Sequence, residues 1–326
     1  MHTLNVKTIE KHDFISSYIQ NLLRGNGNEL NAYLSKVDID KKINKTQSIT
    51  RCYMINSDAQ HMPRVEDLAL KTAFCLLDYA IPRSEIERAK FLDIDENTTA
   101  NTMQLKRKAK KLFTRLEKTG EGGELLLYLL IQNVLKLPQA ISKMSLKTSS
   151  QLHYQGADAI HIGYDERSQK LLLYWGEAKM IKSIDRGIND CFESLSPYLT
   201  GEKGANDPRE RDLQLLMTNL DMANPSLEKA LLKYLDPNDP AFNSLEYRGA
   251  CLIGFDTDIY CSEPFSKIQE IVYKEINTAM DKWISKIDKG INKYDHLNKF
   301  TLDIFIIPFP SVQKFRDSFL EAIKDV

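Results

Sequence analysis

The chain has 326 residues and an ordinary globular composition, with 42% hydrophobic and 27% charged residues. This composition provides enough apolar surface for a sizeable core, and the length suggests two domains or one large domain with an elaborated amino-terminal part. The formal net charge is −1, which excludes a protein that binds nucleic acid through overall positive charge. Any such contact must come from a local basic patch or from a partner.

Cysteine usage and hydropathy indicate the compartment. The five cysteines are widely spaced and form no CxxC pair, which argues against a disulfide framework or a structural zinc site. The first residues contain no long apolar run of the kind found in signal peptides, and the sequence has no stretch of about 18 apolar residues. We therefore expect a cytoplasmic protein with no membrane span.

The amino-terminal third has the weakest patterns. Residues 1–60 are mixed and largely polar, and no role is assigned to them. Apolar residues then recur at helical spacing through residues 64–91, with an interruption at Pro82. Residues 94–102 are polar and are expected to form a loop or linker.

This linker sets the expected boundary between an amino-terminal region of mixed and helical structure, 1–100, and a second domain, 101–326. The second domain opens on a predicted basic helix, 103–118. This helix either neutralises phosphates, or forms a solvated face, or contacts an acidic partner. Four of its cations are the candidate nucleic-acid contacts: Lys106, Arg107, Lys110 and Lys111.

The following segments alternate between helix and strand patterns. A glycine-rich turn at 120–124 leads into an apolar helix that runs to Leu137. Two strands, 158–164 and 170–179, flank a polar turn and predict a hairpin. The remaining helices are expected at 184–199, 226–235, 265–290 and 311–323, the remaining strands at 249–255 and 301–307, and a loop at 201–211. This order predicts an α/β fold in which a mixed β-sheet is flanked by helices.

The second strand of the hairpin ends on a carboxylate and an ammonium group. Because side chains two residues apart on a strand point to the same face, Glu177 and Lys179 project together. Asp158 begins the partner strand, so the hairpin would let Asp158 and Glu177 share one cation. Oxygen ligands suit Mg²⁺ or Mn²⁺, and the Ala178 carbonyl is a further candidate ligand. Lys179 would then position the attacking water and offset charge on a phosphate.

An acidic residue two positions before a lysine is a weak motif by itself, since roughly four such triplets are expected by chance in a chain of this composition. One other match, at residues 40–42, has no strand pattern before it. A structural salt bridge would explain Glu177 and Lys179 as well. Glu124, at the start of an apolar helix, is either a capping-type residue favoured by the helix dipole or an additional metal ligand.

The acidic positions and their neighbours resemble a known group of enzymes. Gly156-Ala157-Asp158, followed by Gly176-Glu177-Ala178-Lys179, resembles the PD-(D/E)XK nucleases, in which an acidic residue precedes an acidic-x-Lys triplet. Ala157 stands where the superfamily has proline. The segments 120–130, 156–161 and 173–179, and a strand at 305–308 before the last helix, narrow the resemblance. Over residues 115–326 the chain resembles HamA, the nuclease subunit of the Hachiman anti-phage defence system.

This resemblance implies a restriction-endonuclease-like core and a DNase that depends on Mg²⁺ or Mn²⁺. It assigns the catalytic Glu and Lys to Glu177 and Lys179, and the metal-binding Asp to Asp158. It also implies a partner, a HamB-type ATP-dependent helicase, that holds the nuclease inactive until DNA is sensed. The sequence has no phosphate-binding GxxxxGK[ST] loop of its own, so energy from ATP would come from such a partner.

Two alternative functions stay open at this point. A nuclease with the same metal chemistry could act on RNA, such as tRNA. A chain with this fold could also be a non-catalytic binding or regulatory subunit of a helicase complex. The intact set of Asp158, Glu177 and Lys179 argues against the second alternative.

Overall fold

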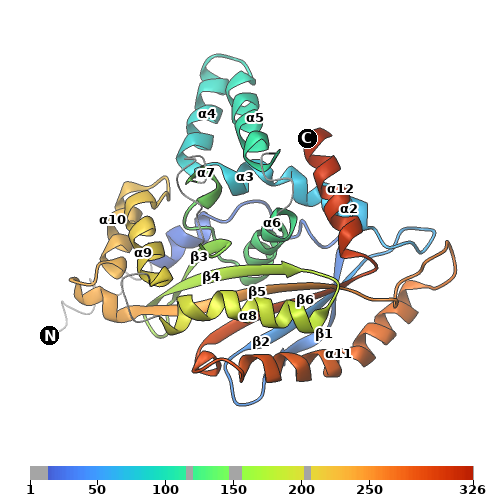
Figure 1. Cartoon of the computed structure of the whole chain (residues 1–326). Helices are drawn as coiled ribbons and strands as arrows, with labels where there is room; N and C mark the ends of the chain where they lie inside the picture. Colours follow the sequence, from blue (N-terminus) through green and yellow to red (C-terminus); the bar gives the residue numbers. More distant parts are fainter. Residues whose placement is uncertain (1–13, 115–119, 147–155, 202–206, 326) are drawn as a thin grey trace.

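One mixed sheet of six strands organises the computed structural model, which describes residues 14–114, 120–146, 156–201 and 207–325 (Figure 1). The strand order across the sheet is β1-β2-β6-β5-β4-β3. The strands are β1 (Leu34–Lys42), β2 (Ile49–Ile55), β3 (Ala159–Asp165), β4 (Lys170–Met180), β5 (Leu245–Asp256) and β6 (Thr301–Phe309). The predicted α/β fold with a mixed sheet flanked by helices is confirmed.

The centre of the sheet is parallel and its edges are antiparallel. β2, β6, β5 and β4 run parallel to one another. β1 pairs antiparallel with β2 at one edge, and β3 pairs antiparallel with β4 at the other. Every residue of β6 after Thr301 is buried, because a parallel strand in the middle of the sheet is covered on both faces.

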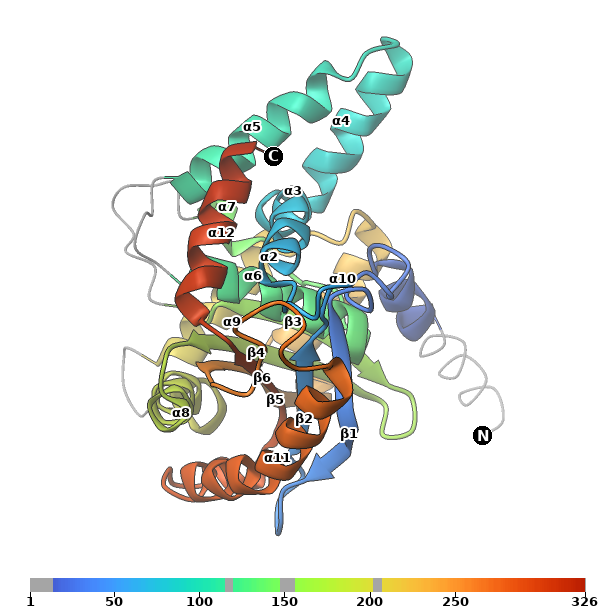
Figure 2. The same cartoon turned by 90° about the vertical axis from the view of Figure 1, so that its right-hand side faces the viewer.

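Helices cover both faces of this sheet, as the side view in Figure 2 shows. On one face lie α8 (Ile184–Thr200) and α11 (Gln269–Ile291). On the other lie α2 (Val65–Phe74), α6 (Glu121–Leu130) and α12 (Val312–Asp325). The shorter elements are η1 (Ile131–Leu135), α7 (Lys143–Leu146), α9 (Pro208–Asn219), α10 (Pro225–Leu235), η2 (Pro240–Ser244) and η3 (Leu297–Lys299). None of the helices that the structure describes is both long and apolar enough to cross a bilayer.

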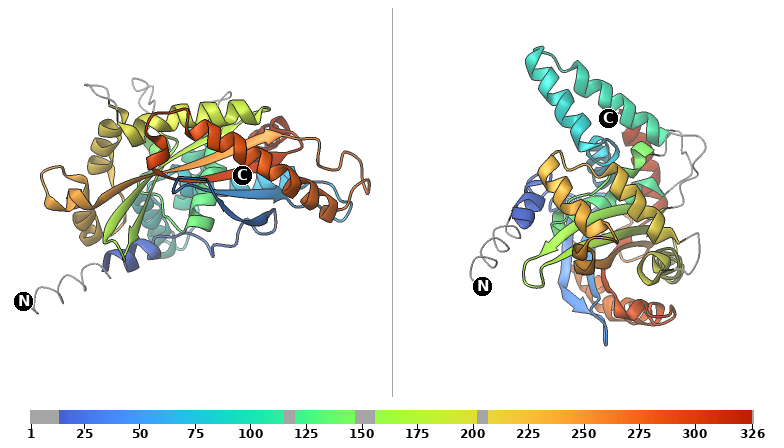
Figure 3. Two further views of the ribbon diagram at one scale, coloured as in Figure 1. Left: turned by 90° about the horizontal axis from the view of Figure 1, so that it is seen from below. Right: turned by 90° about the vertical axis from the view of Figure 1, so that its left-hand side faces the viewer.

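A helical hairpin projects from these layers. It consists of α4 (Arg83–Asp95) and α5 (Ala100–Thr114), and α3 (Leu76–Ala80) joins it to α2 (Figure 3). The Asp93 carboxylate accepts hydrogen bonds from the amides of Asn101 and Thr102 at 2.8 and 2.9 Å, and so fixes the start of α5. The loop expected at 94–102 is therefore shorter than predicted, because α4 continues into this range and α5 begins within it.

The loop expected at 201–211 is also too long. Among the residues described, α9 already begins at Pro208, because Asp207 accepts a hydrogen bond from the Arg209 amide at 2.8 Å and proline fits the first turn of a helix. The basic helix expected at 103–118 is present as α5 up to Thr114, and residues 115–118 lie outside the described part.

The first 60 residues contribute β1 and β2, which the sequence patterns did not reveal. β2 pairs with β6 in parallel, with Cys52 opposite Ile306. The boundary expected near residue 100 falls in the short turn between α4 and α5, and strands from both sides of that boundary belong to one sheet. An amino-terminal strand, β2, and a carboxy-terminal strand, β6, are thus paired within the core.

An ion pair crosses this junction and gives a test of it. Arg51 on β2 and Asp303 on β6 have NH1 and Oδ1 2.5 Å apart, and both side chains are nearly buried. Removing the cation leaves an uncompensated buried carboxylate. We predict that Arg51→Met lowers the free energy of unfolding by about 3 kcal/mol, measured by urea denaturation.

The matched control is the exposed pair of Arg186 and Asp190 on α8. Arg186→Met should change the free energy of unfolding by no more than about 0.5 kcal/mol, because exposed pairs contribute little. If Arg51→Met costs no more than this control, the pair does not stabilise the junction between β2 and β6.

Candidate active site

The β3–β4 hairpin brings two of the predicted acidic residues together. The strands pair antiparallel with Ala159 opposite Gly176, so that Asp158 and Glu177 are the next residues outward on each strand. The Asp158 amide donates to the Gly176 carbonyl at 3.0 Å, which continues the pairing past the end of β3. The predicted hairpin is confirmed, with Asp158 directly before its first strand.

Glu177 and Lys179 point to the face of β4 that α8 covers. Their neighbours Gly176 and Ala178 face α6 instead, since a Cβ atom added at Gly176 would lie 3.1 Å from Leu127 Cδ2. Strand alternation then turns Glu177 and Lys179 the other way. Lys179 Nζ lies 2.5 Å from Glu177 Oε1, and the Glu177 residue is only 5% exposed.

Asp158 lies at the open end of the hairpin. Its Oδ2 accepts a hydrogen bond from the Ala178 amide at 3.0 Å. The carboxylate thus occupies the place where a further residue of β3 would have paired with β4. This bond fixes the Asp158 side chain beside the segment that carries Glu177 and Lys179.

Glu124 approaches the hairpin from α6, where it lies in the first helical turn. The helix dipole favours a carboxylate there. Gly123 lets α6 approach the sheet closely, because a Cβ atom at this position would lie 3.1 Å from Met180 Sδ. Glu124 is 8% exposed, and its Oε2 accepts a hydrogen bond from the Tyr79 hydroxyl at 3.1 Å. Gly123 therefore permits close helix–sheet packing, and Gly122 permits close packing against Phe319 of α12, in addition to the turn expected from the sequence.

The pKa values show that these carboxylates interact. Burial and the charges of Glu124 and Glu177 raise the pKa of Asp158 well above its ordinary value. Burial also raises the pKa of Glu177, against the opposing effect of the Lys179 ammonium. Burial alone would lower the pKa of Lys179, but the charges of Glu177 and Asp158 raise it overall. The charged forms of Asp158 and Glu177 are therefore disfavoured by burial and by one another, and the Lys179 ammonium offsets part of this cost.

The chemistry of this donor set fits a hard divalent cation. Carboxylate oxygens suit Mg²⁺ or Mn²⁺, and a cation would offset the mutual repulsion. In the described part of the chain, however, no three His, Cys, Asp or Glu side chains come together as metal ligands. The carboxylate oxygens are instead engaged by the Ala178 amide, the Lys179 ammonium and the Tyr79 hydroxyl. The metal-binding roles of Asp158, Glu177 and Ala178 stay predictions.

Two groups beside the site were missed by sequence reasoning. Ser194 on α8 acts on Glu177 and opposes the rise in its pKa. Lys143 on α7 donates to the Ala157 carbonyl at 2.9 Å and to Asp212 Oδ2 at 2.7 Å, and both charged side chains are almost fully buried. This ion pair anchors the main chain one residue before the predicted metal-binding aspartate. No local sequence pattern indicates the Lys143–Asp212 pair, because the two residues come from separate segments of the chain.

The candidate nucleic-acid contacts lie on α5, which runs from the tip of the projecting hairpin back toward α12 (Figure 2). All four are at least partly exposed: Lys106, Arg107, Lys110 and Lys111. Phe113, near the end of the same helix, packs on Tyr79 with ring centroids 6.1 Å apart. The basic helix thus reaches the surroundings of the carboxylates through its last turn.

Comparison with known protein families shows to which family the chain belongs. The family model of HamA matches residues 30–323, from just before β1 into α12. The chain belongs to the HamA family. HamA membership supports a role as a component of the Hachiman anti-phage defence system. No curated protein matches the chain. The HamA match includes β1 and β2, and so extends well before residue 115, where the resemblance seen in the sequence begins.

The raised pKa of Asp158 predicts a dependence of stability on pH. The folded chain keeps a proton that the unfolded chain releases near the ordinary value of 3.8, so this group makes the fold less stable as the pH rises from there through the raised pKa. Asp158→Asn removes the effect. In the presence of a chelator, we expect the melting temperature of the wild type to fall more steeply than that of Asp158→Asn as the pH rises above the ordinary carboxyl range.

Asp165→Asn is the control. Bonds from Ser168 and nearby amides lower the pKa of Asp165, so its stabilising effect is lost only as the pH falls below the ordinary carboxyl range. This variant should keep the slope of the wild type. Equal slopes for the wild type and Asp158→Asn would contradict the raised pKa of Asp158.

Proposed function

We propose that this HamA-family protein is a metal-dependent nuclease that cuts DNA as the effector of an anti-phage defence complex. The observation that supports it best is the Glu177–Lys179 pair, 2.5 Å apart, next to Asp158 at the end of the β3–β4 hairpin. Burying these charges is unfavourable for folding alone, which favours a catalytic role. A PD-(D/E)XK core of the restriction-endonuclease type is part of the proposed function.

The proposed ligands of one Mg²⁺ or Mn²⁺ ion are Asp158, Glu177 and the Ala178 carbonyl, with Glu124 as a further candidate. When bound, the ion would lower the pKa of a water molecule and balance charge on the phosphate. The hairpin fixes the spacing of Asp158 and Glu177, and the packing of α6 on β4 fixes the approach of Glu124.

Lys179 has a different role from the carboxylates. Its side chain is 28% exposed whereas that of Glu177 is 7% exposed, so the ammonium group is the more accessible of the two. The raised pKa of Lys179 keeps it protonated at neutral pH. It can therefore donate hydrogen bonds that orient the attacking water and stabilise the charge that develops on the phosphate.

A HamB-type ATP-dependent helicase is the proposed partner, and it would hold the nuclease inactive until DNA is sensed. Membership in the HamA family supports a defence complex. The chain has no GxxxxGK[ST] loop for ATP, and its net charge of −1 gives little general attraction to DNA. Both properties agree with a nuclease that depends on another subunit to reach its substrate.

Cleavage by the co-expressed complex tests the proposed function. We expect Mg²⁺-dependent cutting of plasmid DNA that requires ATP, and Lys179→Ala should slow it at least about 100-fold, because a donor aimed at developing charge is lost. Lys170→Ala is the matched control. Lys170 lies at the other end of β4 and pairs with Glu246 at 3.1 Å, so this variant should keep its activity.

Each contrary outcome contradicts a part of the proposal or favours another function. A soluble Lys179→Ala variant with full activity contradicts the mechanism, and a variant that no longer folds assigns Lys179 a structural role. Cutting of RNA alone selects the RNA nuclease. A complex that cuts neither nucleic acid selects the non-catalytic subunit, and an isolated chain that cuts intact duplex without ATP contradicts the control by a helicase.

The basic helix α5 provides a separate prediction. Replacing Lys106, Arg107, Lys110 and Lys111 with Gln should weaken DNA binding by the complex and flatten its dependence on salt, since fewer phosphates are neutralised. Filter binding over a salt series measures both. The control replaces four exposed lysines in and after α11: Lys274, Lys282, Lys289 and Lys293. Unchanged DNA binding with loss of the partner on size exclusion would identify α5 as a protein interface.

A further inference from the structure

We infer that Tyr79 is a positioning residue of the proposed active site, and that its hydroxyl group holds the Glu124 carboxylate at a fixed place relative to Asp158. The inference rests on the proposed metal-dependent function, and it assigns a role to a residue far from the sequence motif. Tyr79 lies on α3, the short helix that joins α2 to the projecting hairpin.

The hydroxyl of Tyr79 lies between two elements of the site. It donates to Glu124 Oε2 at 3.1 Å and to the Asp158 carbonyl at 3.2 Å. The ionised Glu124 carboxylate and the Asp158 carbonyl oxygen are both acceptors. The hydroxyl group has one proton, which the two acceptors share. One of these acceptors belongs to α6 and the other to the start of the β3–β4 hairpin. The hydroxyl therefore joins the helix that carries Glu124 to the strand that carries Asp158.

The Tyr79 hydroxyl group keeps its proton and therefore remains a hydrogen-bond donor. Tyr79 is 1% exposed. Burial and the charges of Glu124 and Asp158 raise its pKa well above 10, so the phenol keeps its proton throughout the neutral range. A buried tyrosine needs a hydrogen-bond partner, and here both partners are residues of the carboxylate site rather than distant main-chain groups.

The ring of Tyr79 is held from two sides. It packs against Tyr128 on α6, with centroids 5.4 Å apart, and against Phe113 on α5, with centroids 6.1 Å apart. Its position between these helices fixes the direction in which the hydroxyl points. The projecting hairpin thereby contacts the same side chain that contacts Glu124.

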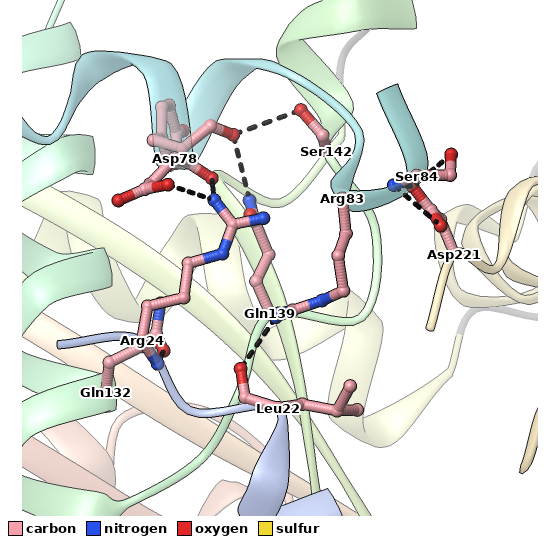
Figure 4. Close-up of polar contacts among 10 residues, drawn as sticks. Leu22, Arg24, Asp78, Arg83, Ser84, Gln132, Gln139, Ser142 and Asp221 are labelled. Carbon is pink, nitrogen blue, oxygen red and sulfur yellow. Dashed lines mark hydrogen bonds and ion pairs between the residues drawn. The ribbon is translucent and has the colours of Figure 1, made fainter. Parts of the chain in front are cut away.

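The main chain around Tyr79 is fixed as well. Its carbonyl accepts from Ser142 Oγ at 3.0 Å and from Gln139 Nε2 at 3.4 Å. In the preceding residue, Asp78, both Oδ1 and the carbonyl accept from Arg24 NH1 at 2.7 Å. Figure 4 shows Arg24, Asp78, Gln139 and Ser142 converging on this turn. Because both its ring and its main chain are fixed, Tyr79 can impose a position on Glu124 instead of adapting to it.

Loss of the hydroxyl should therefore weaken metal binding more than it weakens the fold. Without it, the Glu124 carboxylate loses a donor that fixes its direction, and the Asp158 main chain loses a contact to α3. Residues that orient metal ligands typically change metal affinity tenfold or more when they are replaced. We expect Tyr79→Phe to weaken Mn²⁺ binding by about tenfold.

The experiment measures Mn²⁺ affinity by titration calorimetry, and the melting temperature without metal, on the full-length chain. Tyr260→Phe is the matched control. The Tyr260 hydroxyl is also buried, accepts from the Ile55 amide at 2.9 Å and donates to the Pro308 carbonyl at 2.9 Å, away from the carboxylates. Both variants should lower the melting temperature to a similar degree, and only Tyr79→Phe should weaken Mn²⁺ binding.

A double variant checks that the effect passes through Glu124. In a Glu124→Gln background, Tyr79→Phe should change Mn²⁺ affinity little further, because the carboxylate that it positions is already absent. Unchanged Mn²⁺ affinity in Tyr79→Phe, with a lowered melting temperature, would overturn the positioning role and leave the proposed metal site intact. A wild-type chain that binds no Mn²⁺ would overturn the metal site itself, and the role of Tyr79 with it.

Discussion

The cost of gathering carboxyl groups in a buried place is the constraint on which this structure depends. Asp158, Glu177 and Glu124 are each less accessible than a surface carboxylate, and burial together with neighbouring negative charge raises the pKa of Asp158. Unpaired, each buried charge would cost several kcal/mol. Two elements compensate these groups: β4 supplies the Ala178 amide to Asp158 and the Lys179 ammonium to Glu177, and α3 supplies the Tyr79 hydroxyl to Glu124. The Lys179 ammonium bonds only one of these three carboxyl groups, which is why a cation belongs to the proposed function.

Packing features next to these carboxylates fix the main chain that carries them. Gly123 allows α6 to lie against β4, and the buried pair of Lys143 and Asp212 ties α7 and α9 to the main chain before Asp158. The site therefore draws on elements from both sides of the boundary expected near residue 100. The family match, which runs from residue 30 to residue 323, covers the same set of elements. A carboxylate cluster of this kind needs support from the whole fold, because no single hairpin could balance its charges.

Local sequence patterns predicted the parts of the structure that have local causes. The β3–β4 hairpin, the shared face of Glu177 and Lys179, and the amphipathic helices all follow from periodicity, which a short segment contains in full. β1 was missed because its residues alternate in burial irregularly. β2 was missed because its buried face includes the polar Thr50 and its pairing with β6 spans most of the chain. α9 was missed because its start depends on the cap at Asp207 within a charged segment. Tyr79 could not be recognised either, since a tyrosine in an apolar helical run looks like an ordinary core residue until its hydroxyl contacts are known.

The order of strands in the sheet also determines when the molecule can become complete during synthesis. β6, at residues 301–309, leaves the ribosome after the other five strands of this sheet, yet it lies in the middle between β2 and β5. Until it emerges, a nascent chain lacks the strand that joins the β1–β2 pair to the β3–β4–β5 group, and the apolar edges of β2 and β5 stay unpaired. Contacts this far apart in sequence form late, after the cost of closing a long loop has been met. A chain broken off before residue 301 would lack its central strand, and the carboxylates would then lie on a sheet that is incomplete at its centre.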